Sequence, residues 1–277
     1  MLHERIGLIG AGQMATALAN GFIRAGLTAA DHILAADVDE TARQRFASAT
    51  AAPVTADNVQ VVDQSDLIFL AVKPQQMAAV SAGLRGKIDP SRLLVSIAAG
   101  IRLASLAEWF GQQLRIIRVM PNTPCLIGKG VSAYSLGQHA TPEDGALVGQ
   151  LLAPLGSRWP VEEKLLDAVT GLSGSGPAFV YVIIEALSDA GVRIGLPRAM
   201  AAAMAAQTVR GAAEMVLATD DHPAVLKDRV TSPGGTTIAG LQALEAGGIR
   251  AALMAAVEAA ARRSMELGSQ ENRHVNV

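Results

Sequence analysis

Short apolar runs alternate with longer helical stretches through the first half of the chain. Runs such as LIFLAV are apolar at nearly every position, which is typical of strands buried on both faces of a parallel sheet. The predicted strands are Arg5–Ile9, Ile33–Asp37, Leu67–Val72, Leu93–Ile97, Ile116–Met120 and Val131–Ser135. The predicted helices are Met14–Ala25, Glu40–Ala49, Pro74–Leu84, Leu103–Phe110 and Pro142–Leu152. This alternation predicts an α/β domain of the Rossmann type with a doubly wound, mostly parallel sheet.

The pattern changes around residues 157–163, and no convincing strand is predicted after GSRWPVEE. The second half is predicted to be all-α, with helices Ala178–Ile194, Arg198–Ala218, Thr237–Ala246 and Ile249–Leu267. Several of these helices are apolar on more than one side, and a helix without a polar face is usually buried. We therefore expect a second subunit to cover them, with a self-contained bundle as the alternative. The predicted organisation is an α/β domain over 1–161, a helical domain over 162–268, and a flexible tail over 269–277.

Composition narrows the class of partner. The chain has 277 residues, of which half are hydrophobic and 17% charged, so a sizeable core can form. With 23 basic and 25 acidic residues and 3% aromatic content, nothing favours a nucleic acid or a membrane as partner. No run of about 18 uninterrupted apolar residues indicates a membrane span. The N-terminal stretch has no long apolar region followed by a cleavage site, and Cys125 is the single cysteine. These features favour a cytoplasmic location.

A glycine-rich turn follows the first predicted strand. Gly10, Gly12 and Ala15 form G-x-G-x-x-A where a strand is expected to meet a helix. In that context the first glycine makes a tight turn, the second lets the backbone approach a pyrophosphate, and the helix N-terminus binds the phosphates. Asp37 ends the next predicted strand, where a carboxylate accepts hydrogen bonds from a ribose 2′-OH and repels a 2′-phosphate. The sequence thus predicts a nicotinamide dinucleotide, with NADH at least accepted; Arg43 and Arg45 leave NADPH open.

Three further loops follow predicted strands, where such a sheet binds its ligands. They are Ala71–Gln75, Ser96–Gly100 and Val119–Pro124. Taken singly, Lys73-Pro74 is also consistent with a helix start and Asn122-Thr123-Pro124 with a turn. Together the loops are predicted to form the wall of a cofactor cleft.

No motif for a general base, a nucleophile or a metal site stands out. The five histidines lack zinc spacing, GSG does not match the nucleophile elbow G-x-S-x-G, and Cys125 is interpreted as a buried structural thiol. Hydride transfer to a protonated imine suits such a chain, because the cofactor carries the chemistry. A second unusual stretch is VTSPGGTTIAGLQALE, which has more hydroxyls and glycines than one helix cap needs.

Five motifs together closely resemble the Δ1-pyrroline-5-carboxylate reductase family, from Ile6 to about Gly268. They are GLIGAGQMA, FLAVKPQ, RVMPNTP, LSGSGPAFVYVIIEALSDAGVRIGLPR and VTSPGGTTIAGLQALE. The resemblance implies a Rossmann domain followed by a helical dimerisation domain, with dimers that often assemble into rings such as decamers. It implies NAD(P)H-dependent reduction of (S)-1-pyrroline-5-carboxylate to L-proline, the last step of proline biosynthesis.

The resemblance also implies roles for individual residues. Thr237 would hydrogen-bond the ring nitrogen and is the candidate catalytic residue. The candidate substrate-binding residues are Asp220, Val230, Thr231, Ser232, Gly234, Gly235, Thr236 and Thr237. The candidate cofactor-binding residues are Gly10, Ala11, Gly12, Gln13, Met14, Asp37, Asn58, Ala71, Val72, Lys73, Pro74, Ala98, Ala99, Gly100, Met120, Pro121 and Asn122. Asp37 departs from relatives that place a small hydroxyl residue there to hold a 2′-phosphate.

Two alternatives remain open at this point. One is another NAD(P)-dependent imine or β-hydroxyacid reductase of the same architecture, although GLSGSGPAFVYV lacks the lysine that β-hydroxyacid dehydrogenases carry there. The other is a dinucleotide sensor without turnover, which would not need a second anion pocket such as SPGGTT.

Overall fold

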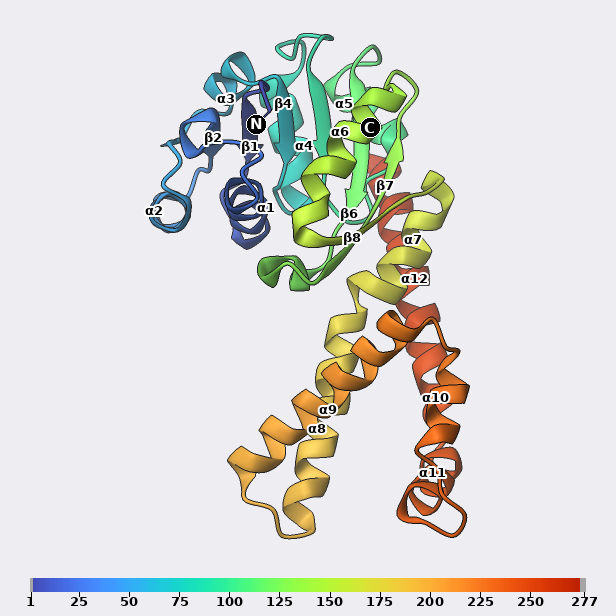
Figure 1. Ribbon diagram of the computed structural model, residues 1–277. Helices are drawn as coiled ribbons and strands as arrows, with labels where there is room; N and C mark the ends of the chain where they lie inside the picture. The colour runs from blue at the N-terminus through green and yellow to red at the C-terminus, as the bar shows by residue number, and fades with distance from the viewer. Residues whose placement is uncertain (1, 275–277) are drawn as a thin grey trace. The chain divides into compact units, whose positions relative to one another are not determined.

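The computed structural model describes residues 2–274 and the side chains of 2–268. The chain forms two compact units, one made of Met1–Ser175 with Ala259–Val277 and one made of Gly176–Glu258 (Figure 1). The last helix of the chain contributes to both units. The boundary expected at residue 161 stays a prediction.

The first unit is built on an eight-stranded sheet with the order β3-β2-β1-β4-β5-β6-β7-β8. Its strands are β1 (Ile6–Ile9), β2 (Ile33–Ala36), β3 (Val54–Thr55), β4 (Leu67–Leu70), β5 (Leu93–Ser96), β6 (Arg115–Met120), β7 (Gly130–Leu136) and β8 (Gly156–Pro160). Strands β1 to β6 pair in parallel, β7 is antiparallel to β6, and β8 is parallel to β7. The predicted doubly wound, mostly parallel sheet is confirmed.

Helices cover both faces of this sheet. The first hydrophobic core lies under α1 (Gln13–Arg24), α2 (Glu40–Thr50) and α6 (Pro142–Leu152), and the second under α3 (Asn58–Gln64), α4 (Met77–Leu84) and α5 (Leu103–Phe110). In β4, Leu67 and Phe69 belong to the first core, while Ile68 and Leu70 belong to the second. Successive side chains of a strand point to opposite faces, so a strand covered on both faces is apolar at every position.

Several elements of this unit were not predicted from the sequence, among them β3, α3 and β8. Strand β3 has two residues, and α3 has seven. The strand within GSRWPVEE was not predicted either: its first five residues form β8 at the edge of the sheet. Trp159 of β8 is 60% exposed, so this strand carries no buried hydrophobic pattern and is set by backbone pairing with β7 alone. The helix expected from Pro74 opens as a 3-10 turn, η2 (Pro74–Gln76), before α4.

The second unit contains α8 (Gly176–Arg193), α9 (Arg198–Thr219), α10 (Pro223–Arg229), α11 (Thr236–Ala246) and the first residues of α12 (Ile249–His274). Helices α8 and α9 pack against each other. Helix α10 was missed because it is a short segment, opened by Pro223 at its first position and capped by His222. The stretch expected to be a flexible tail from residue 269 continues α12 to His274, and residues 275–277 lie outside the described residues.

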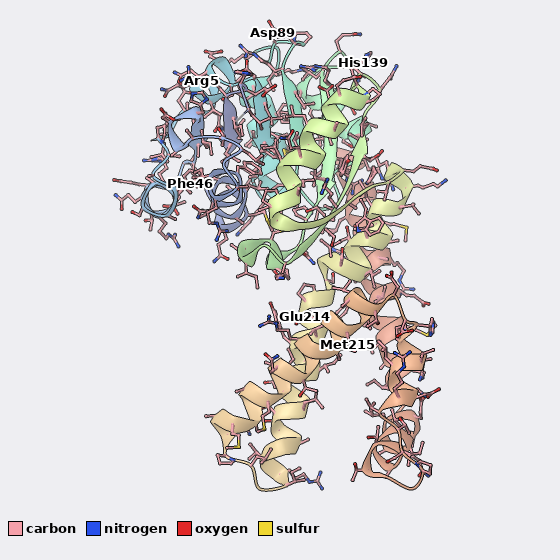
Figure 2. The ribbon with its side chains drawn as sticks, in the orientation of Figure 1. Arg5, Phe46, Asp89, His139, Glu214 and Met215 are labelled. Carbon is pink, nitrogen blue, oxygen red and sulfur yellow. The ribbon has the colours of Figure 1, made fainter. Side chains whose placement is uncertain are left out.

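This helical unit has almost no core of its own. Its buried side chains in the part of the chain that the structure describes are those of Ser188, Ala201 and Ala205. Phe46 is fully buried in the first unit, whereas Met215 of α9 is half-exposed (both labelled in Figure 2).

The helical stretch Glu163–Arg193 also has the length and mean hydropathy of a membrane span, with 6% of it buried. Length and composition are weak grounds for a span, because an apolar helix that a second subunit covers meets the same test. The expectation that the chain makes no membrane contact stays a prediction.

Candidate active site

The loops expected to bind a cofactor begin at one edge of the sheet. The strand register pairs Ile9 with Leu70, Leu70 with Ser96, and Ser96 with Arg118. Residues 10–14, 71–74, 98–100 and 120–122 therefore follow the carboxyl ends of four parallel strands. The strand order reverses between β1 and β4, which is where open α/β sheets bind their ligands.

A cavity of about 460 Å³ opens at this reversal point. The predicted cofactor residues that line it are Gly10, Gly12, Asp37, Asn58, Ala71, Val72 and Lys73. Ala11, Gln13, Met14, Pro74 and the loops 98–100 and 120–122 do not line it. Sequence reasoning missed the remaining lining residues, which are Ala36, Val38, Asp39, Ala42, Gln76, Ala79 and Val80. Gln76 and the α4 alanines follow KPQ directly, so the continuation of that motif was the available signal.

Glycine serves different structural purposes at the two positions of the first loop. Gly10 has φ +101°, and a Cβ there would lie 2.7 Å from the carbonyl oxygen of Ala71. Gly12 has an ordinary φ of −76°, and a Cβ there would meet nothing within 4 Å. Gly12 is the N-cap of α1 and gives the helix no side-chain cap, which leaves the helix N-terminus available to an anion. The loop therefore fits a dinucleotide pyrophosphate, with Gly10 closing the turn and Gly12 leaving room.

Asp37 braces this loop as well as lining the cavity. Its Oδ2 accepts a hydrogen bond from the Ala11 N–H at 2.9 Å, and its Oδ1 accepts one from the Asp39 N–H at 3.0 Å. Each carboxylate oxygen keeps acceptor capacity for a ribose hydroxyl. Arg43 Nη1 donates to the carbonyl oxygens of Asp37 and Val38, at 2.7 and 3.2 Å. The Arg43 guanidinium is thus partly engaged by backbone carbonyls. The negative charge of Asp37 lies in the lining of the cavity, where it disfavours a 2′-phosphate.

The predicted substrate residues other than Asp220 lie at or next to one turn in the helical unit. The Gly235 N–H donates to the Ser232 carbonyl at 3.1 Å, with Pro233 second and Gly234 third in the turn. Gly234 has φ +66°, which is the left-handed conformation that a type II turn requires at its third residue. Gly235 is the N-cap of α11 and provides no side-chain cap, so the first N–H groups of the helix remain available.

The hydroxyl groups around this turn divide into two kinds. Thr231 Oγ1 donates to the Lys227 carbonyl at 2.7 Å, a bond within its own chain segment. The hydroxyls of Ser232, Thr236 and Thr237 have no hydrogen-bond partner among the described residues, and none of the three residues is buried. Asp220 ends α9 in the left-handed conformation, with φ +54°, and Val230 is 67% exposed. A turn with three uncommitted hydroxyls beside an uncapped helix N-terminus is suited to binding a carboxylate.

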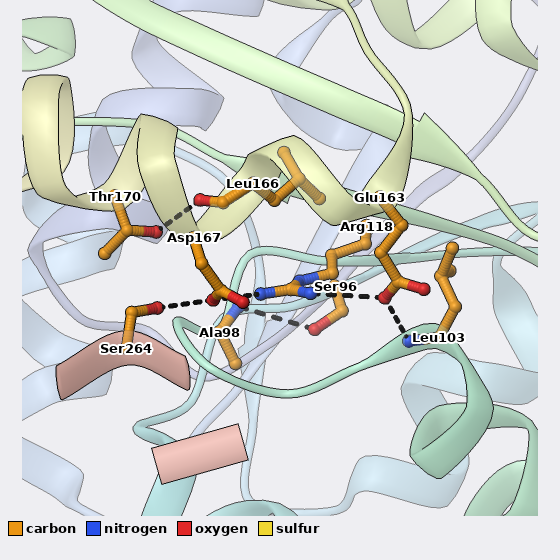
Figure 3. Close-up of polar contacts among 9 residues, drawn as sticks. All are labelled: Ser96, Ala98, Leu103, Arg118, Glu163, Leu166, Asp167, Thr170 and Ser264. Atoms are coloured by element: carbon orange, nitrogen blue, oxygen red, sulfur yellow. Dashed lines mark hydrogen bonds and ion pairs between the residues drawn. The ribbon is translucent and has the colours of Figure 1, made fainter. Parts of the chain in front are cut away.

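A buried charged cluster that the sequence reasoning overlooked stands on β6 (Figure 3). Arg118 is 3% exposed in its side chain, and its Nη1 lies 3.1 Å from Glu163 Oε1. The same Glu163 oxygen accepts the Leu103 N–H at 2.7 Å. Arg118 Nη2 lies 3.8 Å from Asp167 Oδ1, which accepts the Ser264 hydroxyl at 2.7 Å. A charged residue inside the apolar run IIRVM was the signal, because arginine is rarely buried unless it is paired.

This cluster ties β6 to the start of α5, to the segment that leads into α7 (Leu166–Val169) and to α12. It thereby holds together elements that are distant in sequence, directly beneath the loop 120–122.

Cys125 is fully buried, and burial raises the pKa of its thiol above the ordinary value. A thiol held protonated is a poor nucleophile, which fits a structural role. Within residues 2–274, no group of three His, Cys, Asp or Glu side chains is placed to hold a metal ion. That no metal is needed stays a prediction.

Comparisons with known proteins agree with this geometry. The family model described as pyrroline-5-carboxylate reductase dimerisation matches residues 163–267, and the one described as NADP oxidoreductase, coenzyme F420-dependent, matches residues 5–100. The chain is 49% identical to a pyrroline-5-carboxylate reductase of Arabidopsis thaliana, over 95% of each chain. It is 44% identical to one of Methanosarcina acetivorans, over 98% of this chain and 100% of the other.

Among solved structures, the pyrroline carboxylate reductase of Plasmodium falciparum with NADP bound is 34% identical and superposes with a TM-score of 0.88. That match covers 97% of this chain and 99% of the other.

Proposed function

Because the chain belongs to the pyrroline-5-carboxylate reductase family, we propose that it reduces (S)-1-pyrroline-5-carboxylate to L-proline with NAD(P)H. This is the last step of proline biosynthesis. The observation that carries the proposal is the Ser232–Thr237 turn, an anion cradle in the same chain as a dinucleotide cavity. A reductase that acts on a small cyclic imino acid needs both sites.

The nicotinamide, when bound, supplies the hydride. On the cofactor side, Gly10 and Gly12 shape the loop that receives the pyrophosphate, and Asp37 and Asn58, which line the cavity, would bind the ribose. The loops 98–100 and 120–122 complete the cofactor site beyond the cavity at the same edge of the sheet. We propose that all the predicted cofactor-binding residues contribute to this site.

On the substrate side, the N–H groups of Gly234 and Thr236 and the hydroxyl of Ser232 bind the carboxylate, while the Gly235 N–H closes the turn by donating to the Ser232 carbonyl. The positive end of the α11 dipole favours that anion. The uncommitted hydroxyl of Thr237 hydrogen-bonds the ring nitrogen and orients the imine. Val230, Thr231 and Asp220 border the pocket, with Thr231 acting through the conformation of the turn, since its hydroxyl already donates to Lys227.

We propose that the protein works as a dimer, in which the exposed apolar faces of α8 and α9 are covered by a second copy, and that dimers assemble further, up to a decamer. The exposed side chains of Tyr181, Val182 and Leu187 support such self-association, since monomers rarely expose large apolar patches. The single buried thiol of Cys125 supports a cytoplasmic location.

The direct test follows the oxidation of NADH and of NADPH with pyrroline-5-carboxylate added. Turnover that depends on this substrate is expected with both cofactors. Turnover with a hydroxyacid instead would favour the β-hydroxyacid reductase alternative, and cofactor binding without any turnover would favour the sensor.

Thr237→Ala tests the assignment of the hydroxyl. Loss of one hydrogen bond to a charged group is expected to lower kcat/KM by roughly 10–150-fold, or about 1.5–3 kcal/mol. Thr237→Ser keeps the hydroxyl and is expected to retain most of the activity. If Thr237→Ala keeps wild-type kinetics and changes only the melting temperature, Thr237 serves the helix and not the substrate.

A further inference from the structure

The side chain of Asn122, the last residue of the 120–122 loop, is engaged at both ends. Asn122 is 7% exposed. Its Oδ1 accepts the Val131 N–H at 2.8 Å, and its Nδ2 donates to the Ser173 carbonyl at 3.0 Å. An N–H can only donate and a carbonyl can only accept, so these partners fix the orientation of the amide. The side chain therefore bridges β7 and the segment around Ser173.

Ser173 belongs to an unusual piece of helix. Residues Thr170–Gly174 form a π-helical turn, closed by the Ser175 N–H donating to the Thr170 carbonyl at 2.9 Å. The residue four positions beyond Ser173 is Pro177, which has no N–H to donate. Proline thus removes the ordinary helical donor for the Ser173 carbonyl, and the Asn122 side chain supplies one. Single π-helical turns recur at functional sites, where they displace a carbonyl from the helical ladder.

A second contact fastens the same loop to the same turn. A Cβ on Gly174 would lie 2.5 Å from the terminal methyl of Met120, so the glycine makes room for this methionine. Met120 and Asn122 therefore both rest on the π-helical turn, one by packing and one by a hydrogen bond.

We propose that Asn122 is a positioning residue for the nicotinamide cofactor. Its amide holds the 120–122 loop in the shape that the cofactor needs by tying it to the π-helical turn, and the side chain itself does not contact the cofactor. The inference rests on the proposed function, because it takes residues 120–122 as part of the cofactor site. It sharpens the role expected for Asn122, from a direct ligand to a tether.

The decisive variant is Asn122→Asp, which keeps an acceptor for Val131 and replaces the donor to Ser173 with a second acceptor. We expect the Kd and the KM for NADH to rise about tenfold, as follows from losing one buried hydrogen bond. Ser173→Ala is the matched control, because it removes the bond from Ser173 Oγ to the Val169 carbonyl inside the same turn and leaves the tethered carbonyl in place. It is expected to bind NADH as the wild type does.

A rescue experiment separates positioning from stability. Pro177→Ala gives the Ser173 carbonyl a helical donor, so Asn122→Ala/Pro177→Ala is expected to regain the part of the melting temperature that Asn122→Ala loses at Ser173. The part lost at the Val131 N–H, which lacks its acceptor in both variants, is not regained. The double variant is expected to keep the raised Kd for NADH, because the loop remains untied. Recovery of the melting temperature and the affinity together, or wild-type affinity in Asn122→Asp, would overturn the proposal.

A substitute variant and separate assays distinguish a failure of folding, a failure of the proposed function and a failure of the role proposed for Asn122. If Asn122→Asp does not fold, Asn122→Ser takes its place, since its hydroxyl is too short to bridge both partners, and the same tenfold rise is expected. Cofactor affinity is measured without substrate and turnover is measured on the wild type. A wild type without turnover would count against the proposed function, while the affinities of the variants would still decide the role of Asn122.

Discussion

In α1, the side chains of Ala15, Leu18 and Phe22 are closed off from solvent, whereas in α8 those of Tyr181, Val182 and Leu187 are exposed. Both helices are rich in apolar residues, but α1 lies against a sheet of its own unit, and α8 packs within its unit mainly on α9. The sheet unit thus buries its apolar surface by itself. The helical unit presents apolar surface that a single chain does not cover.

Apolar composition alone does not distinguish a closed hydrophobic core from an interface between subunits. In the sheet unit, alternate side chains of the central strands enter one of two cores, so the apolar positions of these strands are buried within the chain. In the helical unit, three described side chains are buried. The stability of the helical unit is therefore expected to depend on protein concentration, while that of the sheet unit is not.

The largest effect is expected from a charged substitution on the exposed apolar face of α8, where a second subunit would pack. Val182→Asp places a carboxylate on a side chain position that is 64% exposed in the single chain. Burying that charge in an interface is costly, so we expect dissociation to monomers and a loss of activity of at least about 100-fold. Size-exclusion chromatography and the reductase assay measure the two effects, and NADH affinity reports on the sheet unit.

The control for this variant is Glu214→Gln on α9, which removes an exposed ion pair with Arg210 that is worth little. It is expected to keep both assembly and activity. A fully active monomer of Val182→Asp would contradict the view that the helical unit is completed by association.

A smaller effect is expected from the glycine loop, where two neighbouring glycines can be compared. Gly10→Ala forces a side chain into a left-handed conformation against the Ala71 carbonyl, which is expected to lower the free energy of unfolding by about 1–3 kcal/mol and to weaken cofactor binding. Gly12→Ala has room for its methyl group, so it is expected to weaken NADH binding and to leave the free energy of unfolding unchanged. Chemical denaturation and NADH titration distinguish the two, and unchanged NADH affinity in Gly12→Ala would rule out a pyrophosphate at this loop.

The smallest effect is expected at Asp37, within the cavity of the sheet unit. Asp37→Asn removes the charge and keeps an acceptor, so kcat/KM for NADPH relative to NADH is expected to rise about tenfold. Asp31→Asn, at the other end of β2, is the matched control and is expected to leave that ratio unchanged. A wild type that already prefers NADPH strongly would show that the carboxylate does not select the cofactor.

Much of the fold was predictable because the signal is local. Continuous apolar strands, the G-x-G-x-x-A turn and the helical runs each depend on neighbours within a few residues, and α5 and α6 begin and end where predicted. Strand β8 was not predictable, because an exposed edge strand is selected by pairing with β7 and not by its own pattern. Gly10, Gly12 and Asp37 could be predicted from the motif and the strand ends, whereas Asn58 was implied by the family resemblance alone; all four line the cavity.

The sequence by itself determined most of the strands and helices, where the glycine turn lies, and that the SPGGTT stretch has more donors than a cap requires. Only the tertiary structure decided which of these groups remain free. It engages the hydroxyl of Thr231 and leaves that of Thr237 uncommitted, and it uses both ends of the Asn122 amide within the protein. It also pairs Arg118 with carboxylates from residues 163 and 167. Such pairings join groups that are far apart along the chain, and hydrogen-bond partners are chosen by distance in space.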